Sequence, residues 1–116
     1  MRTLTPVSRE KVQMYDAVIG VFGELFKELK ELGKKKPEAT LSASKVKLIN
    51  RVLIDAAKCL NGAPDHKYLD TLDDAALPQY GDAILILSQY EGALNAFRKR
   101  HFGFFRNEHQ WMIEGA

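Results

Sequence analysis

The sequence predicts an all-α domain, in which three long amphipathic helices form an up-down-up bundle with one short connecting helix and an aromatic C-terminal tail folded back on the bundle. Two observations lead to this prediction. Apolar residues recur at three- and four-residue spacing through three long segments, and prolines and glycines lie at the ends of these segments. Because 116 residues can bury one core, we expect a single helical-bundle domain over residues 1–116.

The first helix is expected from Ser8 to Leu32, because one face of this segment is apolar throughout. Its apolar positions are Tyr15, Val18, Phe22, Leu25, Leu29 and Leu32, with Ile19 and Phe26 beside them. Either Ser8 or Thr5, the latter with Pro6 at the first helical position, would cap the N-terminus. Gly33, three lysines and a proline are expected to end the helix.

The second helix is expected to begin behind Ser42, which is a suitable N-cap, and to end at the turn sequence of residues 61–64. Its main apolar face consists of Val46, Ile49, Leu53, Ala56 and Leu60. A second stripe lies beside that face and consists of Leu48, Val52 and Cys59. A helix with so broad an apolar surface should contact two neighbours.

The third helix is expected from Pro78 to His101, with Gly103 as its stop signal. Its core face repeats in heptad register and consists of Tyr80, Ala83, Leu87, Tyr90, Leu94, Phe97 and His101. Between the second and third helices, Tyr68, Leu69 and Leu72 follow at helical spacing. They predict a short helix of about two turns within residues 65–77.

The C-terminal tail is rich in aromatic residues, since Phe102, Phe104, Phe105 and Trp111 are four of the eleven in the chain. Such a composition is not typical of a disordered tail. We expect the tail to fold back over the open groove of the bundle. The alternative is that Phe104, Phe105 and Trp111 anchor a partner protein.

Small residues on the third helix suggest a second interaction surface. Glycine is unfavourable inside helices, so a packing reason is worth seeking at each such position. On a strip away from the heptad face lie Gly81, Leu85, Ser88, Gly92 and Ala96. The hypothesis is that a second copy of the chain packs closely on this strip, forming a homodimer. The opposing interpretation is that these glycines are merely tolerated.

The net charge of +2 conceals an uneven distribution along the chain. The first 58 residues carry a surplus of basic side chains and the remaining residues carry a surplus of acidic ones. On the second helix a basic face consists of Lys45, Lys47, Arg51 and Lys58. This face suggests contacts with nucleic-acid phosphates. No aromatic residues interleave with it, so nucleic-acid binding is an alternative function only.

An acidic segment follows the second helix and forms the basis of a third alternative, a metal- or nucleotide-dependent enzyme. Its residues are Asp65, His66, Asp70, Asp73, Asp74 and Asp82. Carboxylates with a histidine suit a divalent cation, but the spacing matches no EF-hand loop, no HExxH motif and no paired Cys/His set. Helix capping and turn formation explain Asp65, Asp73 and Asp74 better than metal binding does. We expect no cofactor.

The single cysteine, Cys59, predicts a reducing compartment, because secreted domains of this size usually carry paired cysteines. The chain begins without an apolar signal segment and has no apolar run long enough to span a bilayer. A cytoplasmic protein without a membrane partner is therefore expected. Since no catalytic motif is present, the leading prediction is a non-catalytic protein–protein interaction module, homodimeric through the third helix.

Overall fold

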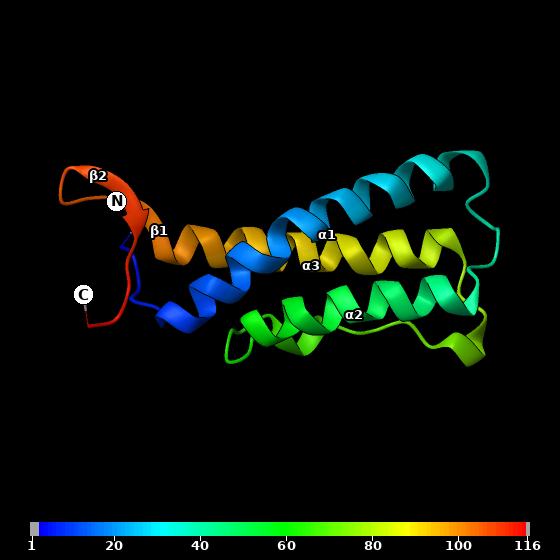
Figure 1. Cartoon of the computed structure of the whole chain (residues 1–116), viewed down its shortest axis with the longest axis horizontal. Coiled ribbons are helices and arrows are strands. Elements are labelled where there is room, and N and C mark those ends of the chain that lie inside the picture. Colours follow the sequence, from blue (N-terminus) through cyan, green and yellow to red (C-terminus); the bar gives the residue numbers. More distant parts are fainter. Residues whose placement is uncertain (1–2, 116) are drawn as a thin grey trace.

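The structure is a computed structural model that describes residues 3–115. The described residues form three α-helices, two single 3₁₀ turns and a two-stranded antiparallel sheet. A mainly helical chain is therefore confirmed, but an all-α fold is wrong, because the C-terminal segment forms a β-hairpin. The molecule is elongated, with extents of 49 × 23 × 22 Å (Figure 1).

Helix α1 spans Arg9–Lys35. The Ser8 hydroxyl accepts a hydrogen bond from the Lys11 backbone N–H at 3.2 Å, so Ser8 rather than Thr5 is the N-cap. The predicted stop at Gly33 is wrong, because the helix continues through this residue. Gly33 is buried, and a Cβ atom there would lie only 2.6 Å from the Ile84 side chain of α3. Its small size thus permits close helix packing.

Helices α2, Ala43–Cys59, and α3, Tyr80–His101, agree closely with the sequence prediction. The Ser42 hydroxyl caps α2 by accepting from the Lys45 N–H at 3.2 Å. All seven residues of the predicted heptad face of α3 are buried. Helix α3 begins two residues later than predicted, and it ends at His101 without Gly103, which lies in the following strand.

The predicted up-down-up order is wrong. Helices α2 and α3 both run opposite to α1 and begin at the same end of the molecule (Figure 1). The backbone confirms this arrangement, because the Leu41 N–H donates to the Pro78 carbonyl at 2.8 Å and Thr40 pairs with Gln79 in an antiparallel bridge. Because α2 and α3 are parallel, the chain must return along the length of the bundle between them. The segment of residues 60–79 is long enough to span that distance.

This connecting segment contains no two-turn helix, so that prediction is also wrong. It contains the single 3₁₀ turns η1, His66–Tyr68, and η2, Asp74–Ala76, joined by extended backbone. The Asn50 side chain of α2 accepts from the Leu72 N–H and donates to the Leu72 carbonyl, both at 2.8 Å. The Tyr90 hydroxyl of α3 donates to the Asp70 carbonyl at 2.9 Å. These bonds satisfy backbone groups that a helix would otherwise pair internally.

The C-terminal hairpin pairs β1, Phe102–Phe105, with β2, Glu108–Trp111. Its two-residue turn places Arg106 and Asn107 in the left-handed region, with φ values of 51° and 68°. This is the backbone of the tight turns that match strand twist. Folding back on the bundle is borne out for Trp111, whose ring lies 5.2 Å from Tyr15 and 5.8 Å from Phe97 between centroids.

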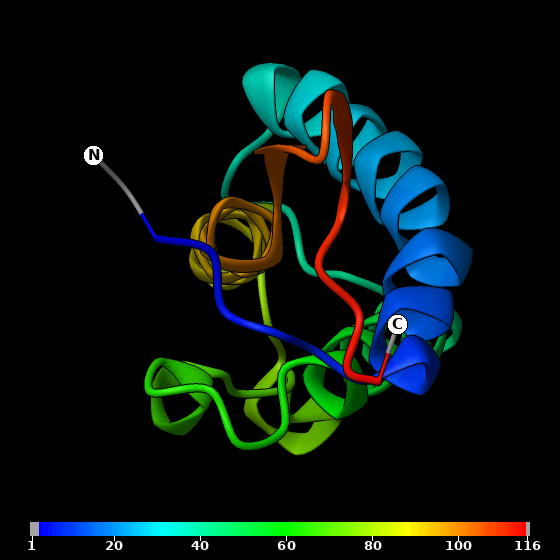
Figure 2. The same cartoon turned by 90° about the vertical axis from the view of Figure 1, so that its left-hand side faces the viewer.

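The N-terminal segment closes the same end of the bundle (Figure 2). The Val7 N–H donates to the Met112 carbonyl at 2.9 Å, and the Glu114 N–H donates to the Val7 carbonyl at 2.8 Å. The two ends of the chain are therefore held together by backbone hydrogen bonds. Among the helices of the described residues, none is long and apolar enough to cross a membrane.

Candidate functional site

An apolar groove lies between α1 and α2 on the outside of the bundle. These two helices lie close together near the start of α1 and diverge toward its end (Figure 1). The partly buried or buried side chains of Met14, Val18, Leu25 and Val52 line the groove. We call this feature the α1–α2 groove.

Two large apolar side chains on the walls of the α1–α2 groove remain exposed. Val21 of α1 retains 56% of its accessible surface and Leu48 of α2 retains 48%. Both residues line the same hollow. A single exposed apolar residue is ordinary, whereas neighbouring ones above an apolar floor are typical of binding surfaces.

The two walls of the groove carry opposite charges. On the α1 side the lining includes Glu24, Glu28 and Glu31 together with one lysine. On the α2 side it includes Arg51 and Lys58 together with one aspartate, Asp55. These charges lie at different stretches of the groove, because the acidic stretch has only Leu48 and Val52 from α2, whereas Arg51 and Lys58 lie opposite apolar residues of α1.

The predicted basic face of α2 is only partly assembled. Lys47, Arg51 and Lys58 line one shallow depression on the outer side of α2. Lys45 points elsewhere, because its Nζ donates to the Tyr80 hydroxyl at 2.6 Å. The depression also contains the carboxylates of Asp55 and Asp74 and the apolar side chains of Leu48 and Ile54. The two carboxylates partly neutralise the three basic side chains.

The predicted strip on α3 lies mainly at the surface. Gly81, Leu85, Ser88 and Gly92 are exposed and Ala96 is partly buried. Apart from the neighbouring residues of α3 itself, no atom of the described chain lies within 4 Å of the position a Cβ would take at Gly92. Leu85, with 64% of its surface exposed, is the large apolar side chain of this strip. Its role in self-association stays a prediction.

The aromatic residues of the tail divide between two roles. Trp111 packs against the bundle, as described above, and Phe105 is partly buried. Phe104 is 64% exposed, and its ring lies 5.2 Å from that of His109 on the hairpin surface. Of the three predicted anchors, Phe104 is thus the one most accessible to a partner.

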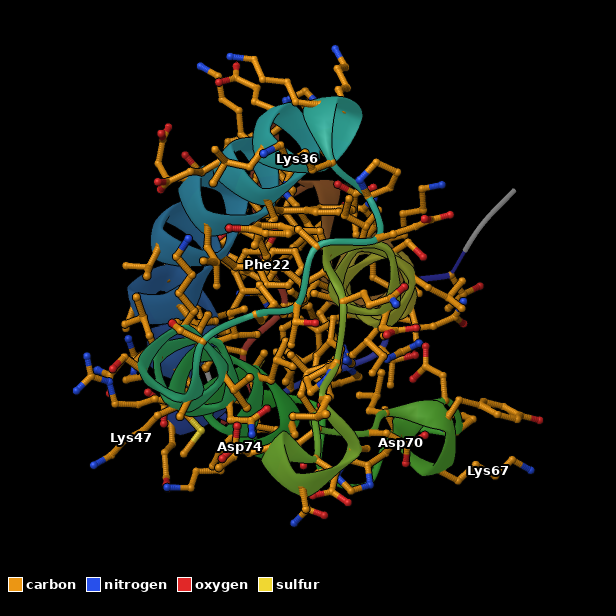
Figure 3. All side chains as sticks on the ribbon, turned by 90° about the vertical axis from the view of Figure 1, so that its right-hand side faces the viewer. Phe22, Lys36, Lys47, Lys67, Asp70 and Asp74 are labelled. Carbon is orange, nitrogen blue, oxygen red and sulfur yellow. The ribbon has the colours of Figure 1, made fainter. Side chains whose placement is uncertain are left out.

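The acidic segment is dispersed in space. Asp70 and Asp74 lie apart on the underside of the bundle (Figure 3). The Asp73 side chain accepts from the Ala75 N–H at 3.0 Å, and Asp82 accepts from the Gln79 N–H at 2.8 Å, which confirms capping for Asp73. Asp65 makes no cap bond. Within residues 3–115, no three His, Cys, Asp or Glu side chains are grouped closely enough to hold a metal ion.

Cys59 and His101 are both buried and lie at the closed end of the bundle. Burial raises the pKa of the Cys59 thiol to about 11, so the thiol is protonated at neutral pH and is a poor nucleophile. The Cys59 Sγ lies 3.6 Å from the Lys11 carbonyl oxygen, to which the thiol donates. A packing role follows for Cys59.

Comparison of the chain with models of protein families, with curated proteins and with solved structures found no match. Function is therefore inferred from surface geometry and charge. Sequence reasoning missed the α1–α2 groove, although one signal for it existed. Leu48 belongs to the second apolar stripe of α2, and Val21 lies beside the main apolar face of α1.

Proposed function

We propose that the chain is a non-catalytic helical-bundle module for protein–protein interaction and that its binding surface is the α1–α2 groove. One observation supports this proposal above all others. Val21 and Leu48 stay exposed on opposite walls of a hollow whose floor is apolar. Grooves of this kind accept an apolar helical face, while charged side chains on the walls select the partner and its orientation.

The proposal can be tested by cross-linking the tagged full-length protein in cells that produce it. Leu48→Glu places a charge in the groove and should reduce the yield of cross-linked protein partner about tenfold or more, because buried apolar anchors carry most interface energy. The matched control is Leu85→Glu, which changes an exposed leucine on α3 that retains 64% of its surface, against 48% for Leu48. This control should leave the yield unchanged.

Two outcomes would contradict the proposal. In the first, Leu48→Glu folds normally by circular dichroism and leaves every cross-link intact. In the second, Leu85→Glu alone abolishes the cross-links, which would move the binding surface to the predicted strip on α3. A loss of helical signal in either variant calls for Leu48→Ser and Leu85→Ser as the milder pair, because exposed positions tolerate such changes with small effects on stability.

Nucleic-acid binding remains the second candidate function, supported by the three cations that share the outer depression of α2. Phosphate contacts would make binding to duplex or single-stranded probes fall steeply with salt, and Arg51→Glu would reduce that slope. The neighbouring Asp55 and Asp74 and the exposed Leu48 and Ile54 favour a protein partner instead.

A further inference from the structure

We propose that Asn61 is a site of spontaneous covalent modification, at which the backbone nitrogen of Gly62 displaces the side-chain amide of Asn61 and a carboxylate is left in its place. The two residues lie in the turn after α2, at the closed end of the bundle. Neither lines the α1–α2 groove, so this inference does not depend on the proposed function. Three features of the turn favour the reaction, namely the residue pair itself, the free backbone N–H of Gly62 and a hydrogen bond from Lys11.

The pair is accessible, and its second residue offers no steric obstacle. Asn61 and Gly62 are both exposed. Gly62 has a φ value of 88°, in the left-handed region that glycine adopts without strain. Because glycine has no Cβ atom, its nitrogen can approach the Cγ atom of the preceding asparagine closely. Asparagine is one of the thermolabile residues of proteins, and a glycine after it hinders ring closure least.

The nitrogen that attacks makes no backbone hydrogen bond. Before it in the turn, the Asn61 N–H donates to the Lys58 carbonyl at 3.3 Å. After it, the Ala63 N–H donates to the Leu60 carbonyl at 3.0 Å. The Gly62 N–H between them has no backbone acceptor within the described part of the chain. Ring closure at Gly62 therefore breaks no backbone hydrogen bond.

Lys11 of α1 activates the peptide group that reacts. Its Nζ donates to the Asn61 backbone carbonyl oxygen at 2.6 Å, and this carbonyl belongs to the same peptide group as the Gly62 nitrogen. When that nitrogen loses its proton, amide resonance shares the negative charge with the carbonyl oxygen. The Lys11 ammonium therefore stabilises the attacking anion, as a positioned donor stabilises a developing oxyanion in an enzyme.

The reaction exchanges an amide for a carboxylate, and water is its only co-reactant. Hydroxide removes the Gly62 proton, the nitrogen bonds to Asn61 Cγ, and the bond from Cγ to Nδ2 breaks as Nδ2 takes a proton from water and leaves as ammonia. Water then opens the five-membered imide. Cleavage of the bond between the nitrogen and Cγ gives aspartate, whereas cleavage at the backbone carbonyl carbon gives isoaspartate. Either product adds one negative charge to a chain whose net charge is +2.

The first test is incubation of the purified full-length protein at physiological temperature and pH, followed by tryptic digestion and mass spectrometry. Tryptic peptide 59–67 contains Asn61 as its only side-chain amide, and peptide 107–116 begins with Asn107. Asn107 is the internal control, because it is also exposed in a turn but is followed by Glu108. Asn61 should react roughly tenfold faster or more, which corresponds to about 1.4 kcal/mol of activation free energy.

The products report the mechanism as well as the rate. Peptide 59–67 should yield both aspartate and isoaspartate, which chromatography separates, because an imide opens at either of its two carbonyl carbons. Equal rates at Asn61 and Asn107 would overturn the site. Aspartate as the sole product would also overturn it, since direct hydrolysis of the side chain needs no attack by Gly62.

The second test removes the Lys11 ammonium. Lys11→Met should slow the modification of Asn61 about threefold to fivefold, the range of an exposed charge interaction, whereas Lys11→Arg keeps a cationic donor and should react at nearly the wild-type rate. Lys58→Met is the matched control, because it removes the same charge from an exposed neighbour of the turn, and should leave the rate unchanged.

Unfolding would expose the pair to hydroxide in a different way, so each variant is first checked by circular dichroism. Should Lys11→Met lose its helical signal, Lys11→Gln takes its place, because it also removes the charge and keeps a longer polar side chain. A folded variant without the Lys11 charge that is modified as fast as the wild type would overturn the role of Lys11. A rate that Lys58→Met lowers equally would do the same, because general surface charge would then explain both effects.

Discussion

At the scale of the residue, His101 joins the end of α3 to the N-terminal segment. Its Nδ1–H donates to the Thr5 carbonyl at 2.6 Å, and its ring packs 4.8 Å from that of Phe97. Burial lowers the pKa of His101, the Thr5 hydrogen bond opposes this shift, and the nearby Arg100 and Lys11 charges lower the pKa further. The neutral imidazole is therefore the form that the folded chain favours.

This lowered pKa predicts a pH dependence of stability. In the unfolded chain the His101 pKa returns to about 6.5, so the unfolded state binds the proton more tightly than the folded state. The contribution to stability is complete above about pH 6.5 and is lost as the pH falls from there through the folded pKa. Urea unfolding of the wild type and of His101→Gln, between about pH 7.5 and about pH 5, measures this contribution.

The wild type should lose more unfolding free energy on acidification than His101→Gln, whose amide can still donate to the Thr5 carbonyl. All other titrating groups are common to both proteins and cancel in the comparison. Equal losses in the two proteins would show that His101 titrates alike in the folded and unfolded chains, and the prediction would then be wrong.

At the scale of the element, the glycines inside the helices differ in what surrounds them. Gly23 of α1 is exposed, and apart from the neighbouring residues of α1 itself no atom of the described chain lies within 4 Å of the position of an added Cβ. Gly33 of the same helix is buried beneath Ile84 of α3. The sequence predicted Gly23 inside the first helix and Gly33 at its end, whereas both lie within α1 and only Gly33 has a packing reason.

Gly23→Ala should therefore raise the unfolding free energy by about 0.5 to 1 kcal/mol, because alanine loses less conformational entropy in a helix. Gly33→Ala is the matched control, since the same gain is opposed there by a contact of 2.6 Å with Ile84. Thermal or urea unfolding measures both. A Gly23→Ala variant no more stable than Gly33→Ala would contradict this prediction.

The hairpin shows why one element escaped sequence reasoning. Its strands are only four residues each, and its turn residues are Arg106 and Asn107, without the glycine that usually marks a tight hairpin turn. The aromatic composition predicted that the tail would fold back, because burying aromatic side chains stabilises the folded chain whatever the backbone conformation. It contained no information about whether that backbone would pair as strands.

At the scale of the whole molecule, the hairpin and the N-terminal segment cover one end of the bundle. Trp111 packs on Tyr15 and Phe97, and Val7 makes backbone hydrogen bonds to both sides of Ile113. Contacts that join the two ends of a chain stabilise the fold only when all parts of the bundle are in place. The hairpin is thus expected to unfold together with the helices.

Deleting residues 104–116 should lower the melting temperature by about 10 °C or more, because it removes Trp111 and the hydrogen bonds to Val7, and large core truncations cost several kcal/mol. The control is a chain shortened only by residues 115–116, which keeps the Glu114 bond to Val7. Differential scanning calorimetry compares the two. An unchanged melting temperature on deleting residues 104–116 would instead favour the tail as an anchor for a partner.

The sequence by itself determined the helices. Apolar spacing located α1, α2 and α3 to within a few residues, and the N-caps of the first two helices were identified at Ser8 or Thr5 and at Ser42, because helix periodicity and capping depend on residues close together in the chain. The burial of the α3 heptad face follows from the same local pattern.

Only the tertiary structure decided the direction of α3, the path of residues 60–79 and the existence of the α1–α2 groove. Each depends on contacts between distant residues, such as Asn50 with Leu72 and Tyr90 with Asp70. The groove arises because α1 and α2 diverge and leave Val21 and Leu48 uncovered. The apolar periodicity of one helix does not determine its crossing angle with a second helix, because that angle depends on how the two helix surfaces pack together.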